Sequence, residues 1–422
     1  MRFLRVALFI APLAVGVQID RQGRETYDGY KVFRVVTDDE QLTGFEAQLG
    51  SLSAIELSRN RGHIDAHHFD IAVPPESLDA FEALNYEAET LTEDLGADIA
   101  LEGELQPFPG LEKSTSGVAA AALPSFSWFS AYHPYADHLT FLKSLQAAFP
   151  SNSELITAGT SFEGRTIQGI HLWGSGGKGS KPAIYYHGNV HAREWISSIT
   201  VEYITYQLIN NYSNDTAIKA VLDNYDFYIL PIVNPDGRWR KNRQTRSGTS
   251  SVGTDINRNW PYQWQGAGSS TSPGSGTYRG EAPGDTPENT GIRTFGDRLG
   301  AGKGIKLYID FHSYGQYILT PYGYSCSATA PNQSKQNTLA RNTGAAIAAV
   351  HGTRFTTGPT CATLYATAGG SNDYFTDVTT AELAWAIELR DTGTYGFTLP
   401  ANQIIPTGEE TWAGQKYLWA NF

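Results

Sequence analysis

Four apolar segments recur through residues 183–389 of this 422-residue chain, and segments with helical amphipathic patterns lie between them. The apolar segments are 183–187, 227–233, 306–311 and 383–389, and the clearest helical patterns span 195–208 and 338–350. A strand that is apolar throughout has to be buried on both faces. The alternation therefore predicts an α/β fold whose mixed sheet is covered by helices on both sides. Ligands of such sheets bind at the carboxyl ends of the strands.

The charge of the chain is unevenly distributed. The net charge is −12, which argues against a nucleic-acid partner. Residues 17–117 carry 21 acidic and 7 basic side chains, whereas the two signs nearly balance from residue 118 onward. Strand-like and helix-like patterns alternate over about 80 residues of the acidic part, which predicts a small separate α+β unit.

The N-terminus has the pattern of an export signal. Arg2 and Arg5 precede an apolar run over 6–15, and small residues at 14 and 16 form a cleavage pattern. We therefore predict a signal peptide over 1–16, an acidic domain with a linker over 17–118, and a catalytic domain over 119–422. The Pro-rich and Ala-rich linker over 106–124 contains Lys113, which would suit a trypsin-like activating protease. No segment is apolar over the length needed to cross a bilayer.

Export also bears on the two cysteines. Cys326 and Cys361 are expected to form a disulfide in an oxidising compartment, with two buried free thiols as the alternative. Three asparagines lie in Asn-x-Ser/Thr sequons and could carry glycans if exposed: Asn211, Asn214 and Asn332.

A candidate metal site follows from two of the predicted strand ends. His191 and Glu194 lie where the strand over 183–187 turns into a helix, and His312 directly follows the strand over 306–311. Imidazole nitrogen and carboxylate oxygen suit Zn²⁺, and a catalytic zinc site uses three protein ligands. His187 lies within a strand pattern, and we expect it to be structural.

Four motifs occur in the same order and carry a family resemblance: His191-Ala-Arg-Glu194-Trp, Asn257-Arg258-Asn-Trp, His312-Ser-Tyr314 and Glu388-Leu-Arg-Asp-Thr-Gly. Together they resemble zinc metallocarboxypeptidases of the pancreatic A/B type, which are made as secreted zymogens. The resemblance spans about residues 120–422, and the acidic N-terminal unit is similar in size and position to the inhibitory prodomain of that family. It implies one Zn²⁺ per chain and hydrolysis of the C-terminal peptide bond.

The resemblance also implies roles for individual residues. Glu388 would be the general base, since amide hydrolysis needs a carboxylate that takes a proton from water and passes it to the leaving amine. An ion pair with Arg390 is the competing structural explanation. Asn257 and Arg258 would bind the free α-carboxylate of the substrate, for which a guanidinium is suited. Further substrate contacts are implied for Arg193, Tyr314, Phe397 and Tyr365, the last as a tyrosine that closes over bound substrate.

Arg240 matches the arginine that stabilises the oxyanion of the scissile carbonyl. The chain departs from the family pattern here, because the loop between Gly237 and Arg238 is short. Either the loop is absent or a segment is missing from the sequence, and Arg238 or Arg243 could instead reach the site.

Asn372 matches the position that sets specificity at the base of the pocket for the terminal side chain. Because it is neutral, a strong preference for Lys or Arg is not expected. The other matching positions are mostly small or apolar: Leu319, Gly323, Thr360, Leu364, Thr367 and Ala386. We therefore expect hydrophobic or broad specificity.

The expected protein is thus a secreted monomeric exopeptidase that acts on peptides with a free C-terminus after activation by another protease. A catalytically impaired relative that binds peptides or a partner is the alternative, because of the short loop before Trp239. An amidase acting on cell-wall peptides is a further alternative, against which the Asn257–Arg258 pair and Tyr365 argue.

Overall fold

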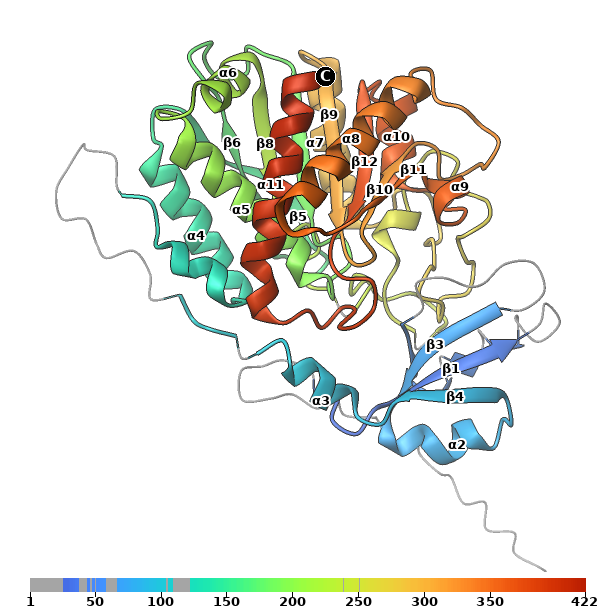
Figure 1. Ribbon diagram of the computed structural model, residues 1–422. Helices are drawn as coiled ribbons and strands as arrows, with labels where there is room; N and C mark the ends of the chain where they lie inside the picture. The colour runs from blue at the N-terminus through green and yellow to red at the C-terminus, as the bar shows by residue number, and fades with distance from the viewer. Residues whose placement is uncertain are drawn as a thin grey trace, which may run out of the picture.

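The computed structural model describes residues 26–37, 44–45, 48–49, 51–57, 67–103, 105–108, 122–237, 239–249 and 251–422. The predicted signal peptide and Lys113 lie outside these residues. The larger part is a three-layer arrangement of helices around one sheet (Figure 1). Its eight strands have the order β11-β10-β12-β9-β7-β8-β6-β5. They span Ser153–Thr160 (β5), Thr166–Leu172 (β6), Ala183–Gly188 (β7), Asp226–Leu230 (β8), Ile305–His312 (β9), Tyr317–Thr320 (β10), Thr356–Pro359 (β11) and Leu383–Glu388 (β12).

The central strands are parallel and the flanking ones make the sheet mixed. β8, β7, β9 and β12 run parallel, whereas β6 pairs antiparallel with β8, and β10 pairs antiparallel with β12. All four predicted apolar strands are present. The segment predicted over 227–233 ends earlier, at Leu230, because Pro231 has no N–H to donate to a neighbouring strand.

Helices cover both faces of this sheet, as predicted. Ile184 and Tyr186 of β7 belong to one apolar cluster and Ala183 and Tyr185 to the other, as the alternation of a strand requires. The first cluster includes residues of α4 (Tyr135–Ala148), α5 (Trp195–Asn211), α6 (Thr216–Asn224), α8 (Gln333–His351) and α11 (Ile404–Asn421). The second includes residues of α7 (Pro287–Ala301) and α10 (Ser371–Asp377). Short helices complete the domain at Phe126–Ser130 (η2), Ile256–Arg258 (η3), Thr360–Thr363 (α9) and Ala401–Gln403 (η4).

The described N-terminal residues form a small α+β unit, drawn in blue beneath the larger part in Figure 1. Its antiparallel sheet has the order β2-β3-β1-β4, and Phe33, Phe69 and Phe81 contribute to its own core. The strands are Lys31–Thr37 (β1), Ile55–Glu56 (β2), His67–Val73 (β3) and Glu87–Thr92 (β4). The helices are Pro75–Ser77 (η1), Leu78–Glu82 (α2) and Leu95–Ala100 (α3).

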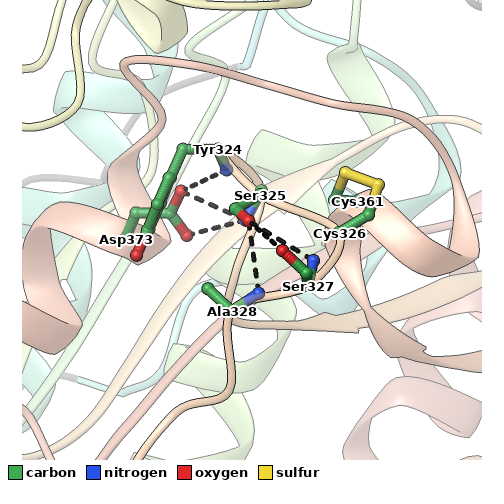
Figure 2. The surroundings of a disulfide bond; sticks show 8 residues. Tyr324, Ser325, Cys326, Ser327, Ala328, Cys361 and Asp373 are labelled. Atoms are coloured by element: carbon green, nitrogen blue, oxygen red, sulfur yellow. Dashed lines mark hydrogen bonds between the residues drawn. A yellow bond between two sulfur atoms is a disulfide. The ribbon is translucent and has the colours of Figure 1, made fainter.

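The two cysteines form a disulfide beside the C-terminal half of the sheet. Cys326 is bonded to Cys361, which joins the loop after β10 to α9 (Figure 2). The buried carboxylate of Asp373 lies beside this loop and accepts hydrogen bonds from the backbone N–H groups of Gly323 and Tyr324. Burial raises the pKa of Asp373 to about 7 although these hydrogen bonds oppose the shift.

The three sequon asparagines differ in exposure. Asn214 is exposed, whereas Asn211 is half-buried at the end of α5 and donates to the Gln207 carbonyl. Asn332 is half-buried and donates to the Glu382 carbonyl at 2.6 Å. A glycan is therefore best accommodated at Asn214.

Candidate active site

The candidate site lies where β7, β9 and β12 end. His312 is the last residue of β9 and Glu388 the last of β12, and the parallel register pairs these two residues directly. His191 lies in the turn after β7, and Glu194 immediately precedes α5. Neighbouring parallel strands therefore deliver these side chains to one edge of the sheet.

His191, Glu194 and His312 form a compact group of possible metal ligands. Their ligand atoms lie within 4.8 Å of one another, and all three residues are buried. Nδ1 of His191 lies 2.8 Å from Oε1 of Glu194, and Nδ1 of His312 lies 3.0 Å from Oε2. Two imidazoles and one carboxylate fit the donor set of a catalytic zinc site with one open position.

Carboxylates hold the outer nitrogens of both histidines. Nε2 of His191 lies 3.1 Å from Oδ1 of Asp255, and Nε2 of His312 lies 2.9 Å from Oδ2 of Asp310. Such partners place the ring proton on Nε2 and leave Nδ1 free to bind a metal. The sequence motifs indicate no role for either aspartate. The position of Asp310 two residues before His312, on the same face of the strand, is the signal that could have revealed it.

Electrostatics favour the charge state that metal binding requires at Glu194. Burial alone would raise the pKa of Glu194, but His191 and His312 outweigh it and lower the pKa below the usual range. For His312 burial acts in the opposite direction and would lower the pKa, but the carboxylates of Asp310 and Glu194 outweigh burial and raise it. The carboxylate of Glu194 is therefore ionised at neutral pH.

Arg240 is the arginine that reaches the site. Its Nη1 lies 3.5 Å from Nδ1 of His191, and its Nε and Nη2 donate to Oδ2 of Asp255 at 3.0 and 2.7 Å. Burial opposes its charge, but Asp255 outweighs burial and raises the pKa of Arg240. Arg243 instead donates to the Asp236 carbonyl, and Arg238 lies outside the described residues. The short loop thus still brings Arg240 to the metal group.

The two residues expected to bind a substrate carboxylate line the same cavity as the metal group, together with Tyr365. Asn257 and Arg258 lie in η3, and Oδ1 of Asn257 accepts a hydrogen bond from the backbone N–H of Ser371. Nε of Arg258 donates to the Gly268 carbonyl at 2.6 Å, and Nη1 donates to the Asn257 carbonyl. These bonds fix the plane of the guanidinium.

Arg193 and two aromatic side chains form the outer wall. The guanidinium carbon of Arg193 lies 3.6 Å from the ring centre of Phe397, and the ring of Tyr314 packs edge-on against Phe397 at 4.7 Å. Arg193 and Phe397 line the cavity, whereas Tyr314 supports Phe397 from behind. Among the described residues, no hydrogen-bond partner is present for the three buried guanidinium nitrogens of Arg193. Burial, with a further contribution from Arg240, lowers the pKa of Arg193 to about 9.

Asn372 also lines the cavity. Its Nδ2 donates to Oγ1 of Thr360 at 3.0 Å, and its Oδ1 accepts from the backbone N–H of Asp373. Both polar atoms of the Asn372 amide are therefore engaged within the wall. The expected pocket positions that line the cavity are Leu319, Thr360, Leu364, Thr367 and Ala386. Gly323 lies behind the wall, where a Cβ would lie 2.0 Å from Oγ1 of Thr367.

Glu388 is half-buried and lines the cavity together with the metal group. Arg390, its competing partner from sequence analysis, pairs elsewhere. Nε and Nη2 of Arg390 donate to the two carboxylate oxygens of Glu410 at 2.8 and 2.6 Å. The competing explanation of Glu388 as the ion-pair partner of Arg390 is therefore wrong.

Residues 138–414 match the family described as zinc carboxypeptidase. The chain belongs to the zinc carboxypeptidase family. It is 46% identical over 421 residues to a metallocarboxypeptidase A-like protein of Trichophyton verrucosum (strain HKI 0517), covering 96% of each chain. It is 42% identical over 399 residues to metallocarboxypeptidase A of Trichophyton rubrum, covering 92% of each chain.

Solved structures agree with this assignment. The crystal structure of thrombin activatable fibrinolysis inhibitor is similar with a TM-score of 0.77 and 26% identity, covering 93% of this chain and 98% of that one. The zinc carboxypeptidase described here is therefore a metallocarboxypeptidase, a hydrolase of peptide bonds. Within the part of the chain that the structure describes, no helix combines the length and hydrophobicity needed to cross a membrane.

Proposed function

We propose that this metallocarboxypeptidase is a secreted zymogen that removes hydrophobic or chemically varied residues from the C-terminus of peptides. The observation that carries the proposal is the convergence of a His–Glu–His group, Glu388 and three arginines in one cavity. His191, Glu194 and His312 would hold one Zn²⁺, which would act as a Lewis acid toward the scissile carbonyl and water.

Glu388 is the general base of the proposed reaction. Its carboxylate takes a proton from the attacking water and delivers it to the nitrogen of the leaving residue. The register that places Glu388 beside His312 supports this role, since both lie at adjacent strand ends.

Arg240 stabilises the negative charge that develops on the scissile carbonyl oxygen. Its guanidinium is held by Asp255 and Gly276, so it needs no reorganisation during the reaction. Loss of such a donor typically costs about 3–4 kcal/mol of transition-state stabilisation.

Arg258 binds the α-carboxylate of the substrate, with Asn257 and Tyr365 as further contacts. A guanidinium fixed by two backbone carbonyls is suited to a planar carboxylate. This requirement for a free C-terminus favours an exopeptidase over an amidase. Arg193, with Phe397 over its face and Tyr314 behind, contacts the substrate beyond the scissile bond.

The chemistry of the pocket supports a hydrophobic or broad preference. The only acidic side chains that line the cavity among the described residues are Glu194 and Glu388, and both belong to the reacting end. Asn372 carries no charge, and its amide is already hydrogen-bonded to Thr360 and to the backbone of residue 373. A lysine or arginine side chain of the substrate would therefore find no charged partner there.

Contacts of the N-terminal unit support a latent precursor. The buried Glu56 of β2 accepts a hydrogen bond from the backbone N–H of Gly276 at 2.6 Å, and the carbonyl of Gly276 accepts one from Nε of Arg240. The ring of Tyr27 packs against Trp239 with centres 5.3 Å apart. The unit thus binds the loops that hold the oxyanion arginine. Its excess of acidic residues complements a site that contains three arginines.

We propose that cleavage near Lys113 by a trypsin-like protease releases this unit. The signal pattern over 1–16 and the disulfide support export, and a monomer is proposed for the mature enzyme. The alternative of an impaired relative is disfavoured because Arg240 reaches the metal group despite the short loop.

The proposal is tested by peptidase activity after limited tryptic cleavage. Blocked dipeptides that end in Phe, Leu, Lys and Arg are supplied with and without a zinc chelator. Chelator-sensitive release of Phe or Leu is the expected result. A tenfold preference for Lys or Arg would contradict the specificity. No release from any substrate by a protein with stoichiometric zinc would indicate a peptide-binding relative.

A further inference from the structure

Behind His312 and its partner Asp310 lie two further buried polar side chains, those of His187 and Tyr308, which have no part in the mechanism proposed above. Tyr308, Asp310 and His312 share one face of β9, and His187 of β7 is the register partner of Asp310. His187, Asp310 and Tyr308 are fully buried. The strand pattern predicts a structural role for His187.

The contacts link these residues into one continuous chain. Nε2 of His187 lies 2.5 Å from the Tyr308 hydroxyl, and its Nδ1 lies 3.2 Å from Oδ1 of Asp310. The other oxygen of Asp310 accepts from the hydroxyl of Ser371 at 2.8 Å and lies 2.9 Å from Nε2 of His312. The chain therefore runs from the interior of the sheet to a proposed metal ligand.

Nδ1 of His187 lies 3.2 Å from Oδ1 of Asp310, within the distance of an ion pair. Neither atom forms a hydrogen bond with a described residue, so the interaction between them is an electrostatic approach. A buried carboxylate is costly without donors, because it cannot be solvated. His187 is thus the group that stabilises the far side of the carboxylate, while Ser371 and His312 occupy its near side.

We infer that His187 is a positioning residue for the zinc site, acting through Asp310 to fix the tautomer and ring orientation of His312. The inference rests on the proposed function of His312 as a ligand. With Oδ1 lying 3.2 Å from Nδ1 of His187, Asp310 keeps Oδ2 directed at Nε2 of His312. That contact leaves Nδ1 of His312 directed at Glu194. A histidine that only filled space would need its volume and the bond to Tyr308, and not the approach to Asp310.

The test measures zinc affinity of the full-length protein by competition with a chelator, without any activity assay. H187F removes both ring nitrogens at similar volume, whereas H187N retains an amide close to the position of Nδ1. D310N removes the charge that links His187 to His312. We expect H187F to weaken zinc binding about tenfold, the lower end of the range for loss of a direct outer partner, because the change acts on His312 through Asp310. H187N is expected to remain within about threefold of wild type.

H171F is the matched control. His171 is also buried on β6, lies 2.7 Å from Asp226 and stacks on Tyr228, and none of its contacts among the described residues belongs to the proposed site. Asp226 keeps two backbone donors when the ring is lost, at Gly179 and Lys181. H171F should leave zinc affinity unchanged. The absorption spectrum of the Co²⁺-substituted protein should change in H187F and not in H171F.

A double mutant decides whether the effect passes through Asp310. H187F should weaken zinc binding no further on the D310N background. The inference is overturned if H187F and H171F bind zinc alike, or if the H187F effect persists in full beside D310N. It is also overturned if H187F lowers only the Tm of the metal-free protein. If the wild-type chain binds no zinc, the proposed function fails and the inference fails with it. If wild type is active and binds zinc and H187F binds zinc equally well, only the inference about His187 fails and the proposed function stands.

Discussion

Replacing Glu56 by Gln should weaken the hold of the N-terminal unit on the catalytic site while preserving side-chain volume. Glu56 is 6% exposed, and its carboxylate accepts hydrogen bonds from the Gly276 N–H at 2.6 Å and the Ser275 hydroxyl at 3.3 Å. A hydrogen bond to a charged group contributes about 1.5–3 kcal/mol and a neutral one about 0.5–1.5 kcal/mol. E56Q should therefore destabilise the closed arrangement by about 1–1.5 kcal/mol. That corresponds to a roughly five- to tenfold rise in the open population.

The assay is hydrolysis of a small blocked dipeptide by the uncleaved protein, whose residual activity reports the open population. E89Q is the matched control, because Glu89 lies in the same small sheet on β4 and is exposed. After limited tryptic cleavage, both variants should equal wild type. Residual activities of E56Q and E89Q within twofold of each other would refute the reasoning, and so would an E56Q defect that persists after cleavage.

Four further predictions concern the site and its surroundings. E388Q should retain zinc but lose about 10²–10⁴-fold in kcat, the usual contribution of a general base, and zinc analysis with steady-state kinetics checks both parts. R240Q should lower kcat about 10²–10³-fold with a smaller change in KM. A rise in KM as large as the fall in kcat would contradict the oxyanion role. N372D should shift preference toward C-terminal Lys and Arg by at least tenfold, measured as the ratio of kcat/KM values against Phe. Burial raises the pKa of Asp373 to about 7, so between pH ~4 and 7 the folded state keeps a proton on this group that the unfolded state has released, and the group's contribution to stability falls as the pH rises through this range. The Tm of D373N should therefore depend less on pH over this range than the Tm of wild type, and parallel Tm profiles would contradict the prediction.

Local sequence patterns predicted which segments form helices and strands better than they predicted the residues at which these elements end. The strand over 183–187 follows from a continuous apolar run and the helix over 195–208 from an amphipathic pattern, and both are present as β7 and α5. The strand over 227–233 was predicted too long, because a backbone effect of Pro231 does not register in hydrophobicity. The early resemblance to zinc carboxypeptidases is confirmed by the family match over 138–414.

The sequence by itself determined which segments become strands, which residues follow them, and the family that these motifs indicate. The tertiary structure alone decided which polar groups meet. Arg240 rather than Arg243 reaches the metal group, Arg390 pairs with Glu410, and Glu56 binds Gly276 across 220 residues of chain. The physical reason is that strand and helix formation depends on neighbouring residues. Contacts between strand ends and loops depend instead on the order β12-β9-β7 in the sheet, which no local pattern contains.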